Sequence, residues 1–290
     1  MSGIDYDSPA ALKAYLDAHG MAMQKKFGQN FLVNAQARRR LVDALELEPG
    51  TSVWEVGPGL GSMTSMILAD GARLTAFEID RGFASCLREE LADYMKGDGA
   101  TFRLVEGDVL KTWKGEWKEN GVPERFFGNL PYNVAAAIVA DMISAGVRFD
   151  KAVITVQKEV AQRITAKPGD DDYSSFSVLC QWAYDVSNII DLAGGSFWPR
   201  PNVDSRAVKM VKKEAFPRCS DPSLFMKLVR ALFAQRRKTI KNNLNALPET
   251  KGRVDEFLEK AGLAPTLRAE VLTVDQMLAL SDVIAEGIQK

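Results

Sequence analysis

The sequence contains only one histidine, His19, and three scattered cysteines, Cys86, Cys180 and Cys219. A single histidine argues against a Ser-His-Asp triad, a cysteine–histidine pair and a metal site built from several histidines. The cysteines are odd in number and form no Cys-x-x-Cys pair, so we expect reduced thiols rather than a disulfide framework or zinc ligands. We expect His19, which lies in a polar stretch, to be a solvated surface residue.

Long hydrophobic runs are also lacking. No stretch of the 290 residues approaches the roughly 20 apolar residues that a membrane-spanning helix needs. The first residues, Met1 to Ala10, are acidic and polar, whereas a signal peptide has a basic start and an apolar segment. The composition, with 46% hydrophobic and 26% charged residues, is typical of a globular enzyme. We therefore expect a cytoplasmic protein with no membrane partner.

The net charge is only −1, but the charges are segregated along the chain. Residues 18–42 contain five basic residues and no acidic one, and residues 206–241 contain eleven basic residues and two acidic ones. The two segments together carry +14, so the rest of the chain carries −15. This distribution is typical of an acidic body with a basic surface for nucleic acid. Basic helix faces that are merely solvated are the alternative interpretation.

From Thr51 onward, short runs of β-branched and aromatic residues alternate with longer segments that have a helical pattern. This alternation predicts an α/β fold with a doubly wound, mostly parallel Rossmann-like sheet and helices on both faces. The expected strands are Ser52–Val56, Leu74–Ile79, Phe102–Val105, Arg125–Phe127, Ala152–Val156, Val186–Asp191 and Arg206–Lys212.

Three parts are expected along the chain. Residues 1–24 lack a sustained hydrophobic period and form an irregular or partly helical leader. Residues 25–213 form the α/β domain. Residues 214–290 contain only helical patterns and form a small all-α C-terminal domain.

The C-terminal domain is expected to begin with a helix whose first residue is Pro222, because the apolar residues that follow have the spacing of a buried face. If this helix continues far enough, four basic residues share a neighbouring face. They are Lys227, Arg230, Arg237 and Lys241. Two further helices are expected at about Arg253–Ala261 and Val274–Glu286.

A glycine-rich turn, Gly57-Pro58-Gly59-Leu60-Gly61, follows the first expected strand and precedes a helix. Its glycines, Gly57 and Gly59 among them, let a ligand lie against the backbone near the helix N-terminus. The spacing departs from a dinucleotide fingerprint, because Gly61 occupies its fifth position and Ser62 its sixth. Glu78 ends the second strand, where a carboxylate can accept both hydroxyls of a ribose. The pattern predicts an adenosine-containing cofactor, with a nicotinamide-dependent oxidoreductase as one alternative.

Acidic residues end three of the expected strands near one edge of the sheet. The third strand leads to Asp108, whose carboxylate can accept a hydrogen bond from an adenine amino group. Such an edge suits a cationic cofactor better than one that carries phosphates.

The motif Asn129-Leu130-Pro131-Tyr132 follows the fourth strand and indicates the reaction. Adenine N6 is a poor nucleophile because its lone pair is delocalised into the ring, unless acceptors hold its hydrogens. The Asn129 side-chain oxygen and the Leu130 carbonyl are candidate acceptors, since Pro131 restricts the backbone at this point. Tyr132 offers a face on which a flipped base can stack.

Several segments occur in the order that is typical of one family. They are Phe27–Leu32, Glu55–Gly61, Glu78, Asp108, Asn129–Asn133, Gln157–Ala161 and Phe197–Ser205. With these segments, the chain from Lys25 to its C-terminus resembles the KsgA-type (RsmA) small-subunit ribosomal RNA adenine N6,N6-dimethyltransferases. We expect Gln157–Ala161 to pack at a junction of strand and helix.

The resemblance implies S-adenosylmethionine as the methyl donor. It implies that Asn30 and Leu32 contact this cofactor from the N-terminal side and that Gly57 lies beneath it. It also implies that Glu78 binds the ribose and that Asp108 binds the adenine amino group.

The target implied by the resemblance is a pair of adjacent adenosines in the 3′-terminal hairpin of small-subunit (16S) rRNA, within the immature small ribosomal subunit. Asn129 would bind the cofactor or the target amine, Tyr132 would stack on the target base, and Phe197 would close over its other face. A core aromatic is the alternative for Phe197. A monomer is expected. The basic C-terminal residues expected to bind RNA phosphates are Arg230, Arg236, Arg237, Lys238 and Lys241.

The sequence departs from the family pattern at Val134–Ala137, at Tyr173–Phe176 and in its longer leader, which affects expected RNA contacts and helix packing. Two alternatives remain within this interpretation. One is the large-subunit (23S) rRNA dimethyltransferase of the macrolide-resistance type, which usually carries isoleucine where this chain has Leu130. The other is a ribosome-assembly factor that acts mainly by binding.

Overall fold

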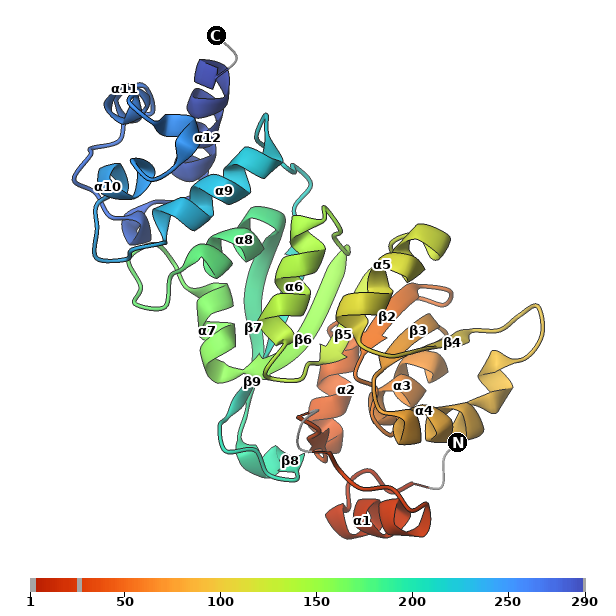
Figure 1. Cartoon of the computed structure of the whole chain (residues 1–290). Helices are drawn as coiled ribbons and strands as arrows, with labels where there is room; N and C mark the ends of the chain where they lie inside the picture. Colours follow the sequence, from red (N-terminus) through yellow and green to blue (C-terminus); the bar gives the residue numbers. More distant parts are fainter. Residues whose placement is uncertain (1–3, 25–27, 289–290) are drawn as a thin grey trace. The chain divides into compact units, whose positions relative to one another are not determined.

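The computed structural model describes residues 4–24 and 28–288, and the chain divides into two compact units (Figure 1). The first unit comprises Met1–Met142, Val147–Ala161 and Ser187–Val211. The second comprises Ile143–Gly146, Gln162–Val186 and Lys212–Lys290. Lys25, Lys26 and Phe27, which belong to the basic N-terminal segment and to the first family motif, lie outside the described residues.

The main sheet has seven strands in the order β4-β3-β2-β5-β6-β9-β7 (Figure 1). Its strands are β2 (Ser52–Val56), β3 (Arg73–Glu78), β4 (Phe102–Glu106), β5 (Arg125–Asn129), β6 (Lys151–Gln157), β7 (Tyr184–Leu192) and β9 (Ser205–Lys212). The first five are parallel to one another, and β9 is antiparallel to β6. Every strand expected from the sequence is present, and the doubly wound α/β fold is confirmed.

The strand order places a topological switch point beside β2. The chain runs outward from β2 to β3 and β4, and then returns to pair β5 with the other side of β2. The helices that follow these strands must diverge at this point, which leaves a crevice at the carboxyl ends of β2 and β5.

Helices follow the strands in the alternating order that the sequence predicts. They are α2 (Ala35–Asp43), α3 (Ser62–Ala69), α4 (Arg81–Glu90), the 3₁₀ turn η2 (Ala92–Met95), α5 (Val109–Asn120), α6 (Ala135–Ser144) and α7 (Lys158–Thr165). Because α7 begins directly after Gln157 ends β6, the expected junction of strand and helix is confirmed.

The core of the first unit occupies both faces of the sheet, because successive strand residues point in opposite directions. On one face, Val53 packs in a hydrophobic cluster with Leu41 of α2 and Ile67 of α3. On the other, the Trp54 ring lies 5.3 Å from Phe77 in an edge-on contact, measured between ring centroids. Burial of both faces explains why the central strands β2, β5 and β6 are mostly apolar.

Two strands of two residues each were not predicted from the sequence. β1 (Phe31–Leu32) pairs antiparallel with β8 (Phe197–Trp198), which follows the short 3₁₀ turn η3 (Gly194–Ser196). Phe31 is opposite Trp198, and Leu32 is opposite Phe197. The pair joins the segment before α2 to the loop between β7 and β9.

The N-terminal leader contains a helix, α1 (Pro9–Ala18), which is capped by the Ser8 side chain. Leu12 and Leu16 of this helix are buried in a cluster that includes Leu60 and Phe83 of the first unit. His19 follows the helix and is exposed, as expected, with its ring stacked on Tyr15.

The second unit is mainly helical. Its helices are α8 (Ser175–Ala183), α9 (Pro222–Leu232), α10 (Ile240–Leu244), α11 (Val254–Lys260) and α12 (Val274–Ile288), with 3₁₀ turns η4 (Pro248–Thr250) and η5 (Ala269–Val271). The Trp182 ring of α8 lies 4.8 Å from Phe225 of α9, between ring centroids. Tyr173, where the sequence departs from the family, is fully buried and donates a hydrogen bond to the Leu272 carbonyl (3.1 Å).

The prediction of one long helical face with Lys227, Arg230, Arg237 and Lys241 is wrong, because α9 ends at Leu232. The Asn243 side chain donates to the carbonyl of Leu232 (2.6 Å) and so caps the end of the helix. Thr239 then caps a separate helix, α10. Among the described residues, the structure has no helix that is long and apolar enough to cross a bilayer.

Candidate functional site

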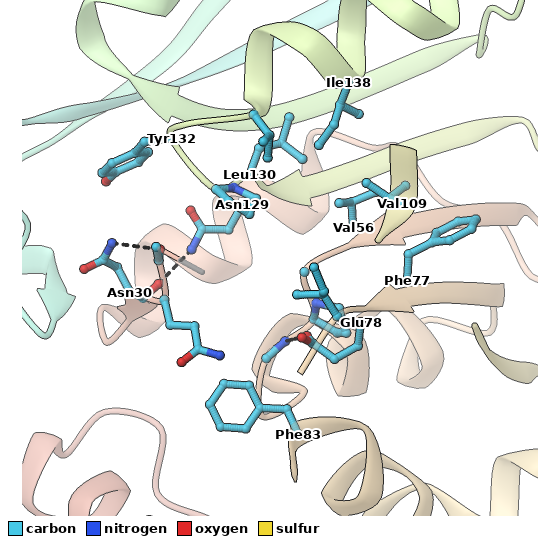
Figure 2. Close-up of a pocket in the computed structure, with 18 of the residues that line it drawn as sticks. Asn30, Val56, Phe77, Glu78, Phe83, Val109, Asn129, Leu130, Tyr132 and Ile138 are labelled. Atoms are coloured by element: carbon cyan, nitrogen blue, oxygen red, sulfur yellow. Dashed lines mark hydrogen bonds between the residues drawn. The ribbon is translucent and has the colours of Figure 1, made fainter. Parts of the chain in front are cut away.

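A cavity lies at the carboxyl ends of β2, β3, β4 and β5 (Figure 2). It encloses about 910 Å³ that no atom fills, and part of this space is open to solvent. Every residue expected to bind cofactor lines this cavity, as do Leu130 and Tyr132. The cofactor candidates are Asn30, Leu32, Gly57, Gly59, Glu78, Asp108 and Asn129.

The glycine-rich turn after β2 forms the floor of the cavity and requires glycine at two positions. Gly59 has a φ of 59°, and a side chain there would come within 3.0 Å of the Phe31 ring. Gly61, at the start of α3, has a φ of 86°, and an added carbon would lie 2.9 Å from Leu87. Only glycine fits this close, left-handed backbone, so the turn exposes main chain to a ligand.

Glu78 is buried, with 4% of its surface exposed, and its carboxylate is held by backbone donors (Figure 2). The amide of Gly59 donates to Oε2 (3.1 Å), and the amide of Asp80 donates to Oε1 (2.8 Å). Burial raises the pKa of Glu78 to about 7, although these hydrogen bonds oppose the shift. The side chain therefore joins the glycine-rich turn to the end of β3, and its remaining lone pairs can accept ligand hydroxyls.

The charge of the cavity wall is one-sided. Glu78 and Asp108 are acidic, and no described residue that lines the cavity is basic. Asp108 also caps α5, because its Oδ1 accepts a hydrogen bond from the Leu110 amide (3.0 Å). A wall of this kind favours a cationic ligand and offers no counter-charge for a phosphate group.

Asn129, at the end of β5, has a fixed side-chain amide. Its Nδ2 donates to the Asn30 carbonyl (2.9 Å), and Asn30 in turn donates from its own Nδ2 to the Gly28 carbonyl (3.1 Å). Figure 2 shows both amides on the same side of the cavity as Tyr132. Because the nitrogen of Asn129 is engaged, its oxygen is the atom left to accept a ligand hydrogen.

The residues that follow Asn129 are also held in place. The Leu130 amide donates to the Thr155 carbonyl of β6 (3.0 Å), and its side chain is buried. The Tyr132 hydroxyl is 2.5 Å from the buried Ser205 hydroxyl of β9, and burial raises the pKa of the tyrosine. The Tyr132 ring is thus anchored at its hydroxyl end beside the cavity.

Phe197 lies elsewhere than expected for a side chain that closes over a base. It does not line the cavity, and it is 3% exposed within the hydrophobic cluster that contains Leu32. The reason is the pairing of β8 with β1, since adjacent residues of a strand point to opposite sides. Trp198 points the other way and stacks on Phe31, with ring centroids 6.2 Å apart.

The sequence from residue 20 to residue 286 matches the family model described as "Ribosomal RNA adenine dimethylase". The chain belongs to this dimethylase family.

Other comparisons agree with this membership. The dimethylase is 48% identical to "Ribosomal RNA small subunit methyltransferase A" of Treponema denticola, over 98% of this chain and 97% of that one. Its fold resembles the crystal structure of a dimethyladenosine transferase from Plasmodium falciparum, with a TM-score of 0.72, 23% identity and coverage of 85% and 94%. It also resembles the 23S rRNA methyltransferase ErmE, with a TM-score of 0.62, 25% identity and coverage of 88% and 99%.

Of the basic side chains expected to contact RNA in this dimethylase, two have partners within the described part of the protein and three do not. Arg236 donates to the Asp171 carbonyl (2.6 Å), and Lys241 forms an ion pair with Asp255 (2.8 Å). The other three side chains are exposed, and none has a hydrogen bond or ion pair to another described residue. They are Arg230, Arg237 and Lys238.

Aromatic residues of the dimethylase cavity were missed by the sequence analysis. Phe31 and Phe83 line the cavity, with their ring centroids 5.7 Å apart. Phe31 belongs to a family motif, but nothing in its spacing indicated a role. Phe83 is on the buried face of α4 and has the pattern of an ordinary core residue.

Proposed function

We propose that this dimethylase transfers methyl groups from S-adenosylmethionine to N6 of two adjacent adenosines in the 3′-terminal hairpin of 16S rRNA, two to each adenosine. The observation that carries the proposal is the position of the Asn129–Tyr132 motif, which shares one cavity with a buried acid and a glycine-rich turn. A donor of methyl groups and a flipped base can therefore meet in this cavity.

The cavity fits the proposed methyl donor. Glu78 offers oxygen acceptors for ribose hydroxyls, and Asp108, which lines the same cavity, can accept a hydrogen bond from an adenine amino group. Ile79 and Val109 supply apolar surface for the adenine ring. The absence of basic side chains among the described lining residues suits a positively charged sulfonium better than a pyrophosphate, which argues against the nicotinamide alternative.

When bound, S-adenosylmethionine supplies a methyl group that its positive sulfur already activates. The protein's task is to orient N6 and to keep its lone pair available. The Asn129 oxygen and the Leu130 carbonyl accept hydrogen bonds from the N6 amino group, while the Tyr132 ring holds the base by stacking. The proton that N6 loses after each transfer passes to water. Because Asn30 fixes the Asn129 amide, these acceptors are oriented before the base arrives. No general base with a tuned pKa is needed, in agreement with a single, exposed histidine.

The small subunit is the better-supported target. The Treponema denticola relative is named a small-subunit methyltransferase and is 48% identical, whereas ErmE, a 23S rRNA methyltransferase, is 25% identical. Leu130 in the motif favours the same choice. We further propose that residues 214–290 bind rRNA phosphates, that the protein acts as a monomer on the immature small subunit, and that it does so in the cytoplasm.

The test is to incubate the protein and labelled S-adenosylmethionine with unmethylated small or large ribosomal subunits and to map the label. We expect label at two adjacent adenosines of 16S rRNA. A Glu78→Gln variant should bind the cofactor about 10- to 100-fold more weakly, since it replaces one of the two carboxyl oxygens by an amide nitrogen that cannot accept a hydrogen bond. The exposed Glu119→Gln variant is the matched control.

Label confined to 23S rRNA would overturn the assignment of the target. If a Glu78→Ala protein lost methylation and still restored maturation of the small subunit, the function would lie mainly in binding, as in an assembly factor.

A further inference from the structure

We propose that Tyr6 and Gln24 are positioning residues that set the affinity for the methyl donor by holding the two loops that contact it. Both belong to the leader, residues 1–24. The inference rests on the proposed use of S-adenosylmethionine, and it adds a part of the chain that precedes the first family motif.

Tyr6 is attached to the glycine-rich turn. Its hydroxyl donates a hydrogen bond to the Leu60 carbonyl (2.8 Å), between the two glycines that need a left-handed backbone. The Tyr6 carbonyl accepts from the buried Arg38 (3.3 Å), which also donates to the Leu32 carbonyl (2.8 Å). Tyr6 is therefore tied both to the floor of the cavity and to the segment that carries Leu32.

Gln24 is attached to the loop after β3. Its Nε2 donates to Oδ2 of Asp80 (3.1 Å), and Gln29, which lines the cavity, donates to the same oxygen (3.1 Å). The other oxygen, Oδ1, accepts from the amides of Gly82 and Phe83 at the start of α4. Asp80 is 5% exposed, so these contacts are sheltered from water.

Asp80 links this cluster to the residue proposed to bind the ribose. The Asp80 amide donates to Oε1 of Glu78, whose other oxygen accepts from Gly59. Gln24 thus acts on Glu78 through Asp80, and Tyr6 acts on the same carboxylate through the turn that carries Gly59. Both attachments converge on one side chain.

The helix between the two attachments is well anchored. Leu12 and Leu16 of α1 are buried against Leu60, Phe83 and Cys86. A carbon added at Gly82 would lie 3.4 Å from Met21, which shows how closely the leader follows the loop after β3. Because α1 is packed in place, the hydrogen bonds of Tyr6 and Gln24, which flank it, can restrict the two loops that they contact.

The test compares Tyr6→Phe and Gln24→Glu with the parent protein by calorimetric titration with S-adenosylmethionine. Tyr6→Phe removes one hydroxyl, and we expect the Kd to rise about three- to tenfold. Gln24→Glu keeps the shape but replaces the donor by a charge that Asp80 repels, so the rise should be at least as large. In methylation assays, KM for the donor should rise while kcat at saturating donor stays within about twofold of the parent.

The matched control is Tyr15→Phe, which removes a hydroxyl from the same leader. The Tyr15 hydroxyl contacts Cys86 Sγ (3.0 Å) and Glu90 Oε1 (3.2 Å) on α4 and neither of the two loops. It should lower the melting temperature while leaving the Kd within about twofold.

The inference is overturned if Tyr6→Phe and Gln24→Glu lower the melting temperature or kcat but leave the Kd unchanged, as a purely structural leader would require. It is also overturned if Tyr15→Phe raises the Kd equally. A parent protein that binds no S-adenosylmethionine would instead refute the proposed function on which the inference rests.

Discussion

At the scale of single residues, Glu55 near the end of β2 differs from Glu78 at the end of β3, because only Glu78 lines the cavity. Glu55 is 1% exposed, does not line the cavity, and has one carboxylate oxygen, Oε2, without a hydrogen-bond partner among the described residues. Burial, with a further contribution from Glu78, raises its pKa to about 8. The group therefore favours its neutral form at physiological pH and places a proton in the core.

This proton makes stability depend on pH. Between about pH 4.5, the ordinary value of a glutamate, and pH 8, the folded chain keeps the proton of Glu55 and the unfolded chain loses it. The free energy of unfolding must therefore fall as pH rises through this window. In Glu55→Gln this fall should be smaller than in the parent by more than about 1.4 kcal/mol, the equivalent of one pKa unit. Denaturant unfolding at several pH values measures it.

The control for this experiment is Glu119→Gln, because Glu119 is largely exposed and far more hydrated. It should leave the pH dependence as it is in the parent. Parallel curves for the parent and Glu55→Gln would contradict the shifted pKa.

At the scale of elements, the antiparallel pair β1–β8 determines which aromatic side chain enters the core. Phe197 is opposite Leu32 in this pair and is buried, while Trp198 is opposite Phe31 and is half-buried. Burial of the Phe197 side chain consequently stabilises the folded protein.

Phe197→Ala should therefore lower the free energy of unfolding by about 3 to 5 kcal/mol, as expected when a large aromatic residue is removed from a core. Phe197→Leu, which keeps an apolar side chain, should cost less and should keep KM for RNA near the parent value. Thermal or denaturant unfolding and steady-state kinetics measure the two effects. A large rise in KM for RNA in Phe197→Leu, without loss of stability, would instead indicate stacking on the target base.

The same elements show what the sequence could predict. The central strands β2, β5 and β6 are runs of mostly buried apolar residues, so composition and flanking turns are enough to locate them. Strands of two residues, such as β1 and β8, have no period to detect, and their existence depends on a partner more than 160 residues away. The side to which Phe197 points depends on this pairing, which no local pattern contains.

The end of α9 was missed for a similar reason. Helical spacing of basic residues continues past Leu232, but Asn243 caps the helix there from a later element. By contrast, the structure brings the predicted cofactor residues Gly57, Gly59, Glu78, Asp108 and Asn129 to one cavity, because the carboxyl ends of neighbouring parallel strands necessarily meet.

At the scale of the whole molecule, the near-zero net charge is the sum of acidic and basic side chains that lie in different places. The described residues of the cavity wall include acids and no bases, and Arg230, Arg237 and Lys238 are exposed on the second unit without partners among the described residues. Unpaired cations bind phosphates without first breaking an ion pair, whereas Lys241 must release Asp255.

Arg237→Ala and Lys238→Ala should each weaken binding to small-subunit rRNA and reduce the slope of log affinity against log salt concentration by about 1. Lys241→Ala should have a smaller effect, because its charge is already compensated. Filter binding at salt concentrations from roughly 50 to 200 mM measures the slope. A flat salt response in the parent protein would refute phosphate binding by the C-terminal residues.

The hydrogen bond between Asn129 and Asn30 makes the two positions unequal in their tolerance of substitution. The acceptor is the main-chain carbonyl of Asn30, which every amino acid supplies, so position 30 can change its side chain without losing this contact. Position 129 has no such freedom, since aspartate would bring a carboxylate oxygen to within 2.9 Å of that carbonyl oxygen. Aspartate has nearly the same shape as asparagine, but at position 129 it would replace this hydrogen bond by repulsion between two oxygen atoms.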